Sequence, residues 1–166
     1  MKHKILFSIT AAALLWVFAC SPEKEAMRKV DKPLPEVSLG QETFTIDTSK
    51  DTLLEIKSGT NIFIPAHSIV DKDNQAVPEA TVQYEEYIDQ ASILLSGIPM
   101  EYDSANQENV FTSAGMFWIN AKKADGEQLF VADDQSIRVD MVSNITDEEG
   151  PYNFYEFDTT AGNWGY

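Results

Sequence analysis

The sequence is poor in the residues that build most catalytic and metal centres. Its 166 residues include one cysteine, Cys20, and two histidines, His3 and His67. A single cysteine excludes an intramolecular disulfide and a thiolate metal cluster. With so few histidines, a zinc site of the usual nitrogen and sulfur ligands is excluded as well. Any histidine-dependent base in the main part of the chain would have to be His67, so we expect no enzyme activity and no cofactor.

Positive charge is also scarce. The chain has 12 lysines and arginines against 27 aspartates and glutamates, which gives a net charge of −15. Binding to nucleic acid needs a basic surface, so this class of partner is excluded. Electrostatic attraction to an anionic membrane surface is disfavoured for the same reason. Such an excess of negative charge favours a domain that stays dispersed in solution.

A helical hydrophobic period is missing after residue 40, and strand patterns stand in its place. Alternating, β-branched or aromatic runs predict strands over 43–46, 53–56, 61–64, 81–85 and 137–141. Turn signals occur at 58–59, 71–74, 125–126 and 149–151. This spacing is typical of a β-sandwich or a partly closed barrel. We predict one all-β domain of short antiparallel strands over residues 39–166, with at most one helical turn at 89–95.

The N-terminus has the pattern of an export signal. Lys2 and Lys4 precede an apolar run over residues 5–19 that only Ser8 and Thr10 interrupt. This basic-then-apolar order is typical of a secretory signal, and the run is shorter than the roughly 20 residues of a membrane-spanning helix. Removal of residues 1–19 would leave 10 basic and 27 acidic residues, a net charge of −17.

The residues Val17-Phe18-Ala19-Cys20 resemble the lipobox of bacterial lipoproteins. The resemblance implies that the signal is cut before Cys20 and that this cysteine carries the lipid. Two or more acyl chains give stable anchoring. Ser21 follows the cysteine, and no aspartate is there to indicate inner-membrane retention, so the outer membrane is favoured with either face open. Residues 20–38, with prolines among charges of both signs, are expected to form a flexible tether.

Three further motifs are Gly-Thr-Asn-Ile-Phe-Ile-Pro-Ala at 59–66, Leu-Leu-Ser-Gly-Ile-Pro-Met at 94–100 and Ser-Ala-Gly-Met-Phe at 113–117. Together they resemble an uncharacterised β module of Bacteroidota envelope lipoproteins. The resemblance implies the fold and an envelope location but no particular ligand or reaction. The first motif is also similar to the opening of a protein-binding β module shared by ankyrins and netrin receptors. Physically, Pro65 should end a strand, and Gly97 and Gly115 should adopt conformations that other residues avoid.

Two groups of side chains deserve a chemical interpretation. Asp71, Asp73 and Asn74 lie in one predicted turn, and oxygen ligands of this kind suit calcium. A solvated acidic turn is the favoured interpretation, because the later glycine and distant glutamate of a calcium loop are missing. His67 could serve a hydrolase, but its neighbour Ser68 should point to the opposite side of an extended chain. We therefore expect His67 to be a surface or turn residue.

Modification signals form a separate class. Three Asp-Thr or Asp-Ser pairs resemble the short O-glycosylation signal of exported Bacteroidota proteins, with the acceptors Thr52, Ser104 and Thr159. Such pairs are also common in turns, and both interpretations stay open.

Aromatic residues crowd the C-terminal end. We predict a strand over 153–158, a turn over 159–163 and a returning strand that starts at Trp164. An arm of three residues is short for a strand, so we expect a truncated or naturally shortened hairpin. Tyr155 and Phe157 should share one face with Phe154 on the other, which leaves one face exposed. Exposed aromatic rings could stack on sugars or anchor a protein, whereas ordinary cross-strand pairing is the alternative.

The sequence therefore predicts a membrane-anchored envelope lipoprotein with a non-catalytic β domain that binds or scaffolds a protein or glycan. A calcium-stabilised adhesion module and, less favoured, a hydrolase that uses His67 are the alternatives.

Overall fold

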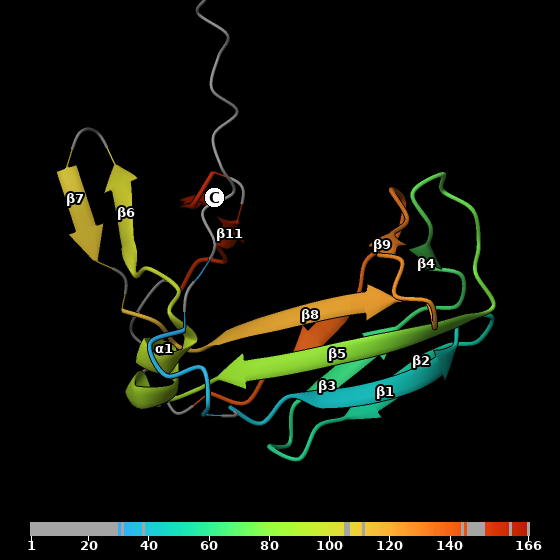
Figure 1. Ribbon diagram of the computed structural model, residues 1–166, viewed down its shortest axis with the longest axis horizontal. Helices are drawn as coiled ribbons and strands as arrows, with labels where there is room; N and C mark the ends of the chain where they lie inside the picture. Colours follow the sequence, from blue (N-terminus) through green and yellow to red (C-terminus); the bar gives the residue numbers. More distant parts are fainter. Residues whose placement is uncertain are drawn as a thin grey trace, which may run out of the picture.

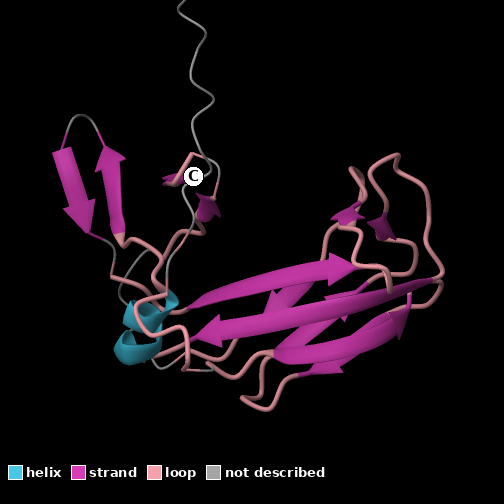
Figure 2. Ribbon diagram, viewed as in Figure 1, coloured by secondary structure: helices cyan, strands magenta, loops and turns pink. Residues whose placement is uncertain are grey.

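The computed structural model describes residues 30, 32–37, 39–104, 107–110, 112–143, 145, 152–159 and 161–165. These residues form twelve strands and one short helix, so the prediction of an all-β domain is confirmed (Figures 1 and 2). The predicted signal over 1–19, Cys20 and the predicted turn over 149–151 lie outside the described residues.

Two antiparallel sheets of three strands face each other (Figure 2). The first sheet has the order β1-β5-β8, with β1 at Glu42–Asp47, β5 at Glu79–Tyr87 and β8 at Met116–Lys122. The second has the order β10-β3-β2, with β10 at Arg138–Asp140, β3 at Asn61–Ile64 and β2 at Thr52–Glu55. Among the described strands there is no closed barrel, so the sandwich is the better of the two predicted architectures.

The core lies between the two sheets and follows the period-two pattern of the sequence. In β5, Ala80, Val82 and Tyr84 point inward and are buried, and in β3 Ile62 and Ile64 do the same. Each fully buried side chain of this size contributes roughly 1.5–3 kcal/mol through the hydrophobic effect. The alternation fixes the register, because a slip by one residue would turn these side chains to the solvent.

Smaller elements lie at the two ends of the sandwich (Figure 1). The pair of β4 at Ile69–Val70 and β9 at Phe130–Val131 marks one end, which we call the β9 end. The other, which we call the α1 end, carries the helix, two hairpins and the segment 32–37. Its elements are α1 at Gln90–Ser96, β6 at Glu101–Ser104, β7 at Gln107–Val110, β11 at Glu156–Asp158 and β12 at Asn163–Gly165.

Local capping defines α1. The Asp89 carboxylate accepts a hydrogen bond from the Ser92 N–H, and the Ser92 side chain bonds back to Asp89, so the helix begins with a capping box. Gly97 ends it in the left-handed region with φ of 72°. The sequence predicted at most one helical turn at 89–95. The helix lies there, at Gln90–Ser96, and its seven residues form about two turns.

Gly115 shows what the third sequence motif does. Its φ is +140°, and a Cβ at this position would lie 2.6 Å from the Met141 Cε and 3.8 Å from the Tyr87 carbonyl. The glycine therefore lets the chain before β8 pass close to two other segments. The expectation of an unusual backbone at Gly97 and Gly115 is confirmed. Asn74 also adopts a left-handed conformation, with φ of 57°, just before Gln75.

Candidate functional site

One long side of the sandwich is open. On the opposite side, the short connection over 48–51 joins the edge strands β1 and β2 directly. On the open side, the edge strands β8 and β10 do not pair with each other. The side chains between them are half-buried and apolar: Phe117, Ile119 and Ala121 of β8, with Ile137 and Val139. We call this strip the open seam.

The seam contains a small apolar cavity of about 100 Å³. Val82 and Leu129 form its buried wall, and Ile119 and Ile137 line it from the two sheets. Its polar neighbours, Asn120 and Gln128, bond to each other. At the β9 end the lining continues into the exposed side chains of Phe130 and Val131. The cavity is too small for a large ligand, but it can hold single apolar side chains.

The outer backbone edge of β8 is only partly paired within the described residues. The Ala121 carbonyl accepts a hydrogen bond from the Leu129 N–H at 2.9 Å on the outer side of the strand. Alternate residues of a strand direct their polar backbone groups to the same side, so Phe117 and Ile119 direct theirs outward too. In the part of the chain that the structure describes, no backbone partner reaches these two residues there. The seam therefore combines apolar side-chain sites with an available hydrogen-bonding edge.

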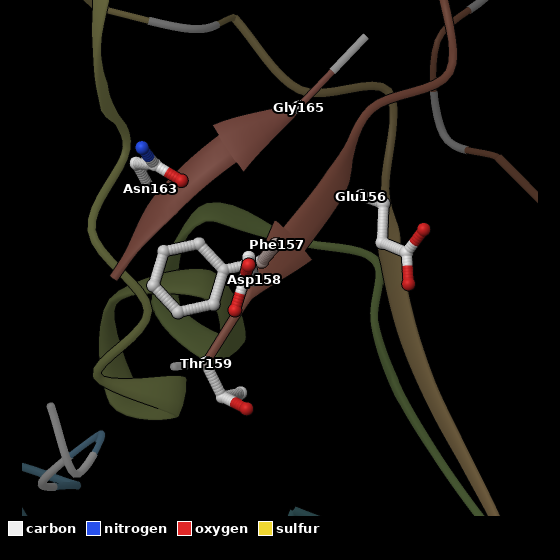
Figure 3. A pocket seen from close by; sticks show the side chains of 6 residues that line it. All are labelled: Glu156, Phe157, Asp158, Thr159, Asn163 and Gly165. Atoms are coloured by element: carbon white, nitrogen blue, oxygen red, sulfur yellow. The ribbon is translucent and has the colours of Figure 1, made fainter. Parts of the chain in front are cut away.

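A second concavity of about 430 Å³ lies on the β11–β12 hairpin (Figure 3). Glu156, Asp158 and Asn163 share one face of the hairpin with Gly165, which has no side chain to fill the space. Phe157 belongs to the opposite face, where it meets Trp164 edge to face at 5.2 Å. These carboxylate and amide groups could bond sugar hydroxyls, but the Phe157–Trp164 pair belongs to the other face and two strands alone supply a shallow surface.

The prediction of one exposed aromatic face near the C-terminus agrees with the structure. Phe154 is 87% exposed, whereas Tyr155 and Phe157 are half-buried. The predicted strand over 153–158 is wrong in its first half, because only Glu156–Asp158 pairs with β12. Pairing between β11 and β12 therefore begins at Glu156.

Two neighbouring carboxylates on β5, Glu85 and Glu86, are held by specific side-chain contacts. The Thr60 hydroxyl donates to Glu86 Oε2 at 2.9 Å, and the Tyr84 hydroxyl donates to the same oxygen at 3.2 Å. Burial, and then the charge and hydrogen bonding of Glu86, raises the pKa of Tyr84. Glu85 lies on the opposite face of β5, where Lys32 contacts it. Nothing in the local sequence marks the contacts with Lys32 and Thr60, because these residues lie 53 and 26 positions from their partners.

His67 lies apart from any catalytic arrangement in the described residues. It is exposed, has φ of 60°, and donates its backbone N–H to the Thr48 carbonyl at 2.7 Å. Ser68 is fully buried and its hydroxyl donates to the Pro65 carbonyl at 2.7 Å. The expected divergence of His67 and Ser68 is confirmed.

In the candidate calcium turn, the Asp71 carboxylate accepts hydrogen bonds from the backbone of the turn itself. Asp71 Oδ1 accepts hydrogen bonds from the N–H groups of Asp73 and Gln75, each at 3.0 Å. The Gln75 bond is the main cause that lowers the pKa of Asp71, and the nearby Lys123 adds to it. Across residues 39–104 and the other described segments, no three histidine, cysteine, aspartate or glutamate side chains are placed to hold a metal ion.

The three candidate glycosylation acceptors occupy different environments. Thr52 is half-buried at the start of β2, and Thr159 is exposed after β11. Ser104 ends β6, and its side chain lies outside the described part. Of the two whose side chains are described, Thr159 is the more accessible.

Comparison with known proteins gives no match: no protein-family model, no curated protein and no solved structure is significantly similar to this chain. Within the described segments, no helix has the length and apolar character needed to cross a membrane.

Proposed function

We propose that the chain is a lipid-anchored envelope lipoprotein whose β domain binds a protein partner without catalysis. The partner contributes an extended segment that lies along β8 and fills the open seam. The observation that carries this proposal is the coincidence of an unpaired strand edge with half-buried apolar side chains in one strip.

The chemistry of the seam favours a polypeptide over other ligands. An extended chain offers alternating N–H and C=O groups that match the outward groups of Phe117 and Ile119. Its side chains alternate in direction, so every second one can enter the apolar strip. Addition of a strand to a sheet edge is a recurring mode of peptide recognition. A sugar or a lipid would satisfy only one of these two features.

Anchoring is supported by the sequence. The basic and apolar N-terminal segment, the lipobox-like residues before Cys20 and the absence of any other cysteine agree with one another. We propose the outer membrane as the location. Substitution Cys20→Ala should abolish incorporation of labelled lipid, leave uncleaved precursor and release the protein from the outer-membrane fraction. Unchanged labelling of the Cys20→Ala protein would show that this part is wrong.

Binding at the seam is tested with a matched pair of variants. Ile119→Asp places a charge in the strip, and Thr45→Asp places the same charge at an exposed position of β1, at the other edge of the first sheet. A photoreactive residue at position 119, but not at position 45, should crosslink to an envelope protein. The captured partner should then bind the parent and Thr45→Asp proteins and fail to bind Ile119→Asp.

Hydrogen exchange distinguishes strand addition from a looser contact. On binding, the amides of Phe117 and Ile119 should exchange more slowly, because the added strand supplies their missing partners. The melting temperature of each variant serves as the control for folding. If a captured partner leaves the exchange of both amides unchanged, the proposed binding mode is wrong.

A further inference from the structure

The segment that leads to the lipid anchor is fastened to the domain. Lys32 Nζ lies 2.9 Å from Glu85 Oε1 and 3.2 Å from Glu85 Oε2. The Glu85 side chain is 7% exposed, and it lies on the outer face of the first sheet beside the buried Tyr87. Segment 32–37 then runs beside α1 (Figure 1). We call the Lys32–Glu85 pair the clamp.

The clamp is more than an ordinary surface ion pair because one partner is buried. A carboxylate removed from water needs a charged or hydrogen-bonding partner, and Lys32 supplies two contacts to it. Burial, followed by the charge and hydrogen bonding of Glu85, raises the pKa of the Tyr87 hydroxyl. Loss of Lys32 would leave the buried Glu85 without its cation, which is strongly unfavourable. Segment 32–37 is therefore held to the domain and is part of it.

The clamp limits how far the domain can lie from Cys20. Only 11 residues lie between Cys20 and Lys32. Even a fully extended chain would span no more than about 40 Å over this distance. The lipid attached to Cys20 would thus remain close to the end of the domain at which the chain enters, which is the α1 end.

Exposed apolar side chains gather at the same end. They come from four separate segments: the clamped segment, α1, the β6–β7 hairpin and the chain before β11 (Figure 1). Leu94 on α1 and Val110 on β7 are each 72% exposed, and Phe154 is 87% exposed. The remaining members are Leu34, Val37 and Tyr152. Single exposed apolar residues are normal, whereas several at one end indicate an interaction surface.

We propose that the α1 end rests on the lipid surface, with the clamp fixing this orientation. The inference depends on the proposed lipidation of Cys20. Apolar side chains and an amphipathic tyrosine suit the boundary between headgroups and acyl chains. Because the mature chain would carry a charge of −17, the contact is apolar and prefers zwitterionic to anionic lipid.

The orientation is tested on the full lipidated protein in phosphatidylcholine vesicles. Cys20 is blocked by its lipid, so an introduced cysteine can be labelled alone with an environment-sensitive dye. Leu94→Cys reports on the α1 end, and Leu53→Cys, an exposed residue of β2, is the matched control. Brominated lipid should quench the dye at position 94 and leave the dye at position 53 unchanged. Vesicles rich in anionic lipid should give less quenching at position 94.

The role of the clamp is tested by Lys32→Met in the Leu94→Cys background. This substitution keeps most of the side-chain length and removes the charge. It should reduce quenching at position 94, whereas Lys57→Met, which changes the charge equally at an exposed position, should not. Equal quenching at positions 94 and 53, or at position 94 with and without the clamp, would overturn the proposal. A protein that carries no lipid by mass spectrometry would contradict the proposed anchoring instead, so the two failures are distinguishable.

Discussion

The indole N–H of Trp164 donates a hydrogen bond to the Pro99 carbonyl at 2.6 Å, which joins the C-terminal hairpin to the loop after α1. Two-stranded hairpins are marginally stable on their own, so this long-range bond, with the packing of Trp164 on Phe157, holds the hairpin in place. It also links the second sequence motif to the aromatic end of the chain.

The hairpin should nevertheless be less stable than the sandwich. We expect the amides of Phe157 and Trp164 to exchange faster than those of Ile62 and Val82, because local opening of the hairpin leaves the core intact. Trp164→Phe removes the bond to Pro99 and should accelerate exchange in the hairpin alone, whereas Trp118→Phe on β8 should leave it unchanged. Hydrogen exchange followed by mass spectrometry or NMR measures this. Equal protection of Trp164 and Ile62 would show that the hairpin belongs to the cooperative core.

Thr60 should be a major determinant of stability. Its buried hydroxyl donates to Glu86 and accepts a hydrogen bond from the Val142 N–H at 3.1 Å. Thr60→Val leaves both partners without this contact, and a buried polar group without a partner costs about 1–3 kcal/mol. The free energy of unfolding in urea measures the loss. Thr45→Val, at an exposed position of β1, is the matched control and should change it by less than about 0.5 kcal/mol.

The buried tyrosines predict sensitivity to high pH. Burial raises the pKa values of Tyr84 and Tyr87 in the folded state, and the charges of Glu86 and Glu85 raise them further. The folded protein then binds protons more tightly than the unfolded one, so this stability is present below about pH 10 and is lost as the pH rises above that value. Tyr84→Phe removes one of these groups. The free energy of unfolding is measured from about pH 8 to about pH 11, which spans the ordinary tyrosine pKa of about 10. With rising pH it should fall less steeply for this variant than for the parent.

Gly115→Ala should destabilise the protein through two effects. A positive φ at a residue with a side chain costs about 1–3 kcal/mol, and the added methyl group would also approach Met141 Cε at 2.6 Å. Gly126→Ala shares the positive φ and meets no atom within 4 Å, so it isolates the backbone effect. We expect a larger drop in melting temperature for Gly115→Ala. If both variants melt alike, the contact with Met141 adjusts without cost.

His67→Ala should leave binding and fold nearly intact. The residue is exposed and its backbone bond to Thr48 survives the substitution, so the change in stability should stay within about 0.5 kcal/mol. Thermal unfolding and partner binding are the measurements. A loss of cellular function by orders of magnitude in a folded variant would instead support the hydrolase hypothesis.

The sequence predicted those parts of the fold that depend on local pattern. Strands with clean alternation, such as 81–85 within β5, occur where they were expected, and the left-handed residues Asn74 and Gly97 follow from residue type. Strand β8 was missed, because Met116–Lys122 mixes aromatic, polar and small residues without clear alternation. Helix α1 was understated because its signal lies in the Asp89 and Gly97 caps and has no hydrophobic period.

The candidate sites depend on features that no local pattern contains. The open seam exists because β8 and β10 are the outer strands of their sheets, and strand order is not encoded in a single segment. The burial of Glu85 depends on Lys32, 53 residues away. The alternation of a strand places Glu85 and Glu86 on opposite faces, but their partners are found only in the folded structure.

The unpaired edge of β8 also bears on how this protein behaves when it is concentrated. A strand edge that can accept a partner's chain can equally accept the edge of another copy, which is the usual starting point for aggregation. The net charge of −15 opposes this self-association, because two copies must bring their negative charges together before their edges meet. Salt weakens that repulsion beyond about 10 Å at 0.1 M ionic strength. Colloidal stability and ligand binding thus depend on the same edge, and the acidic composition of the chain protects it while it is empty.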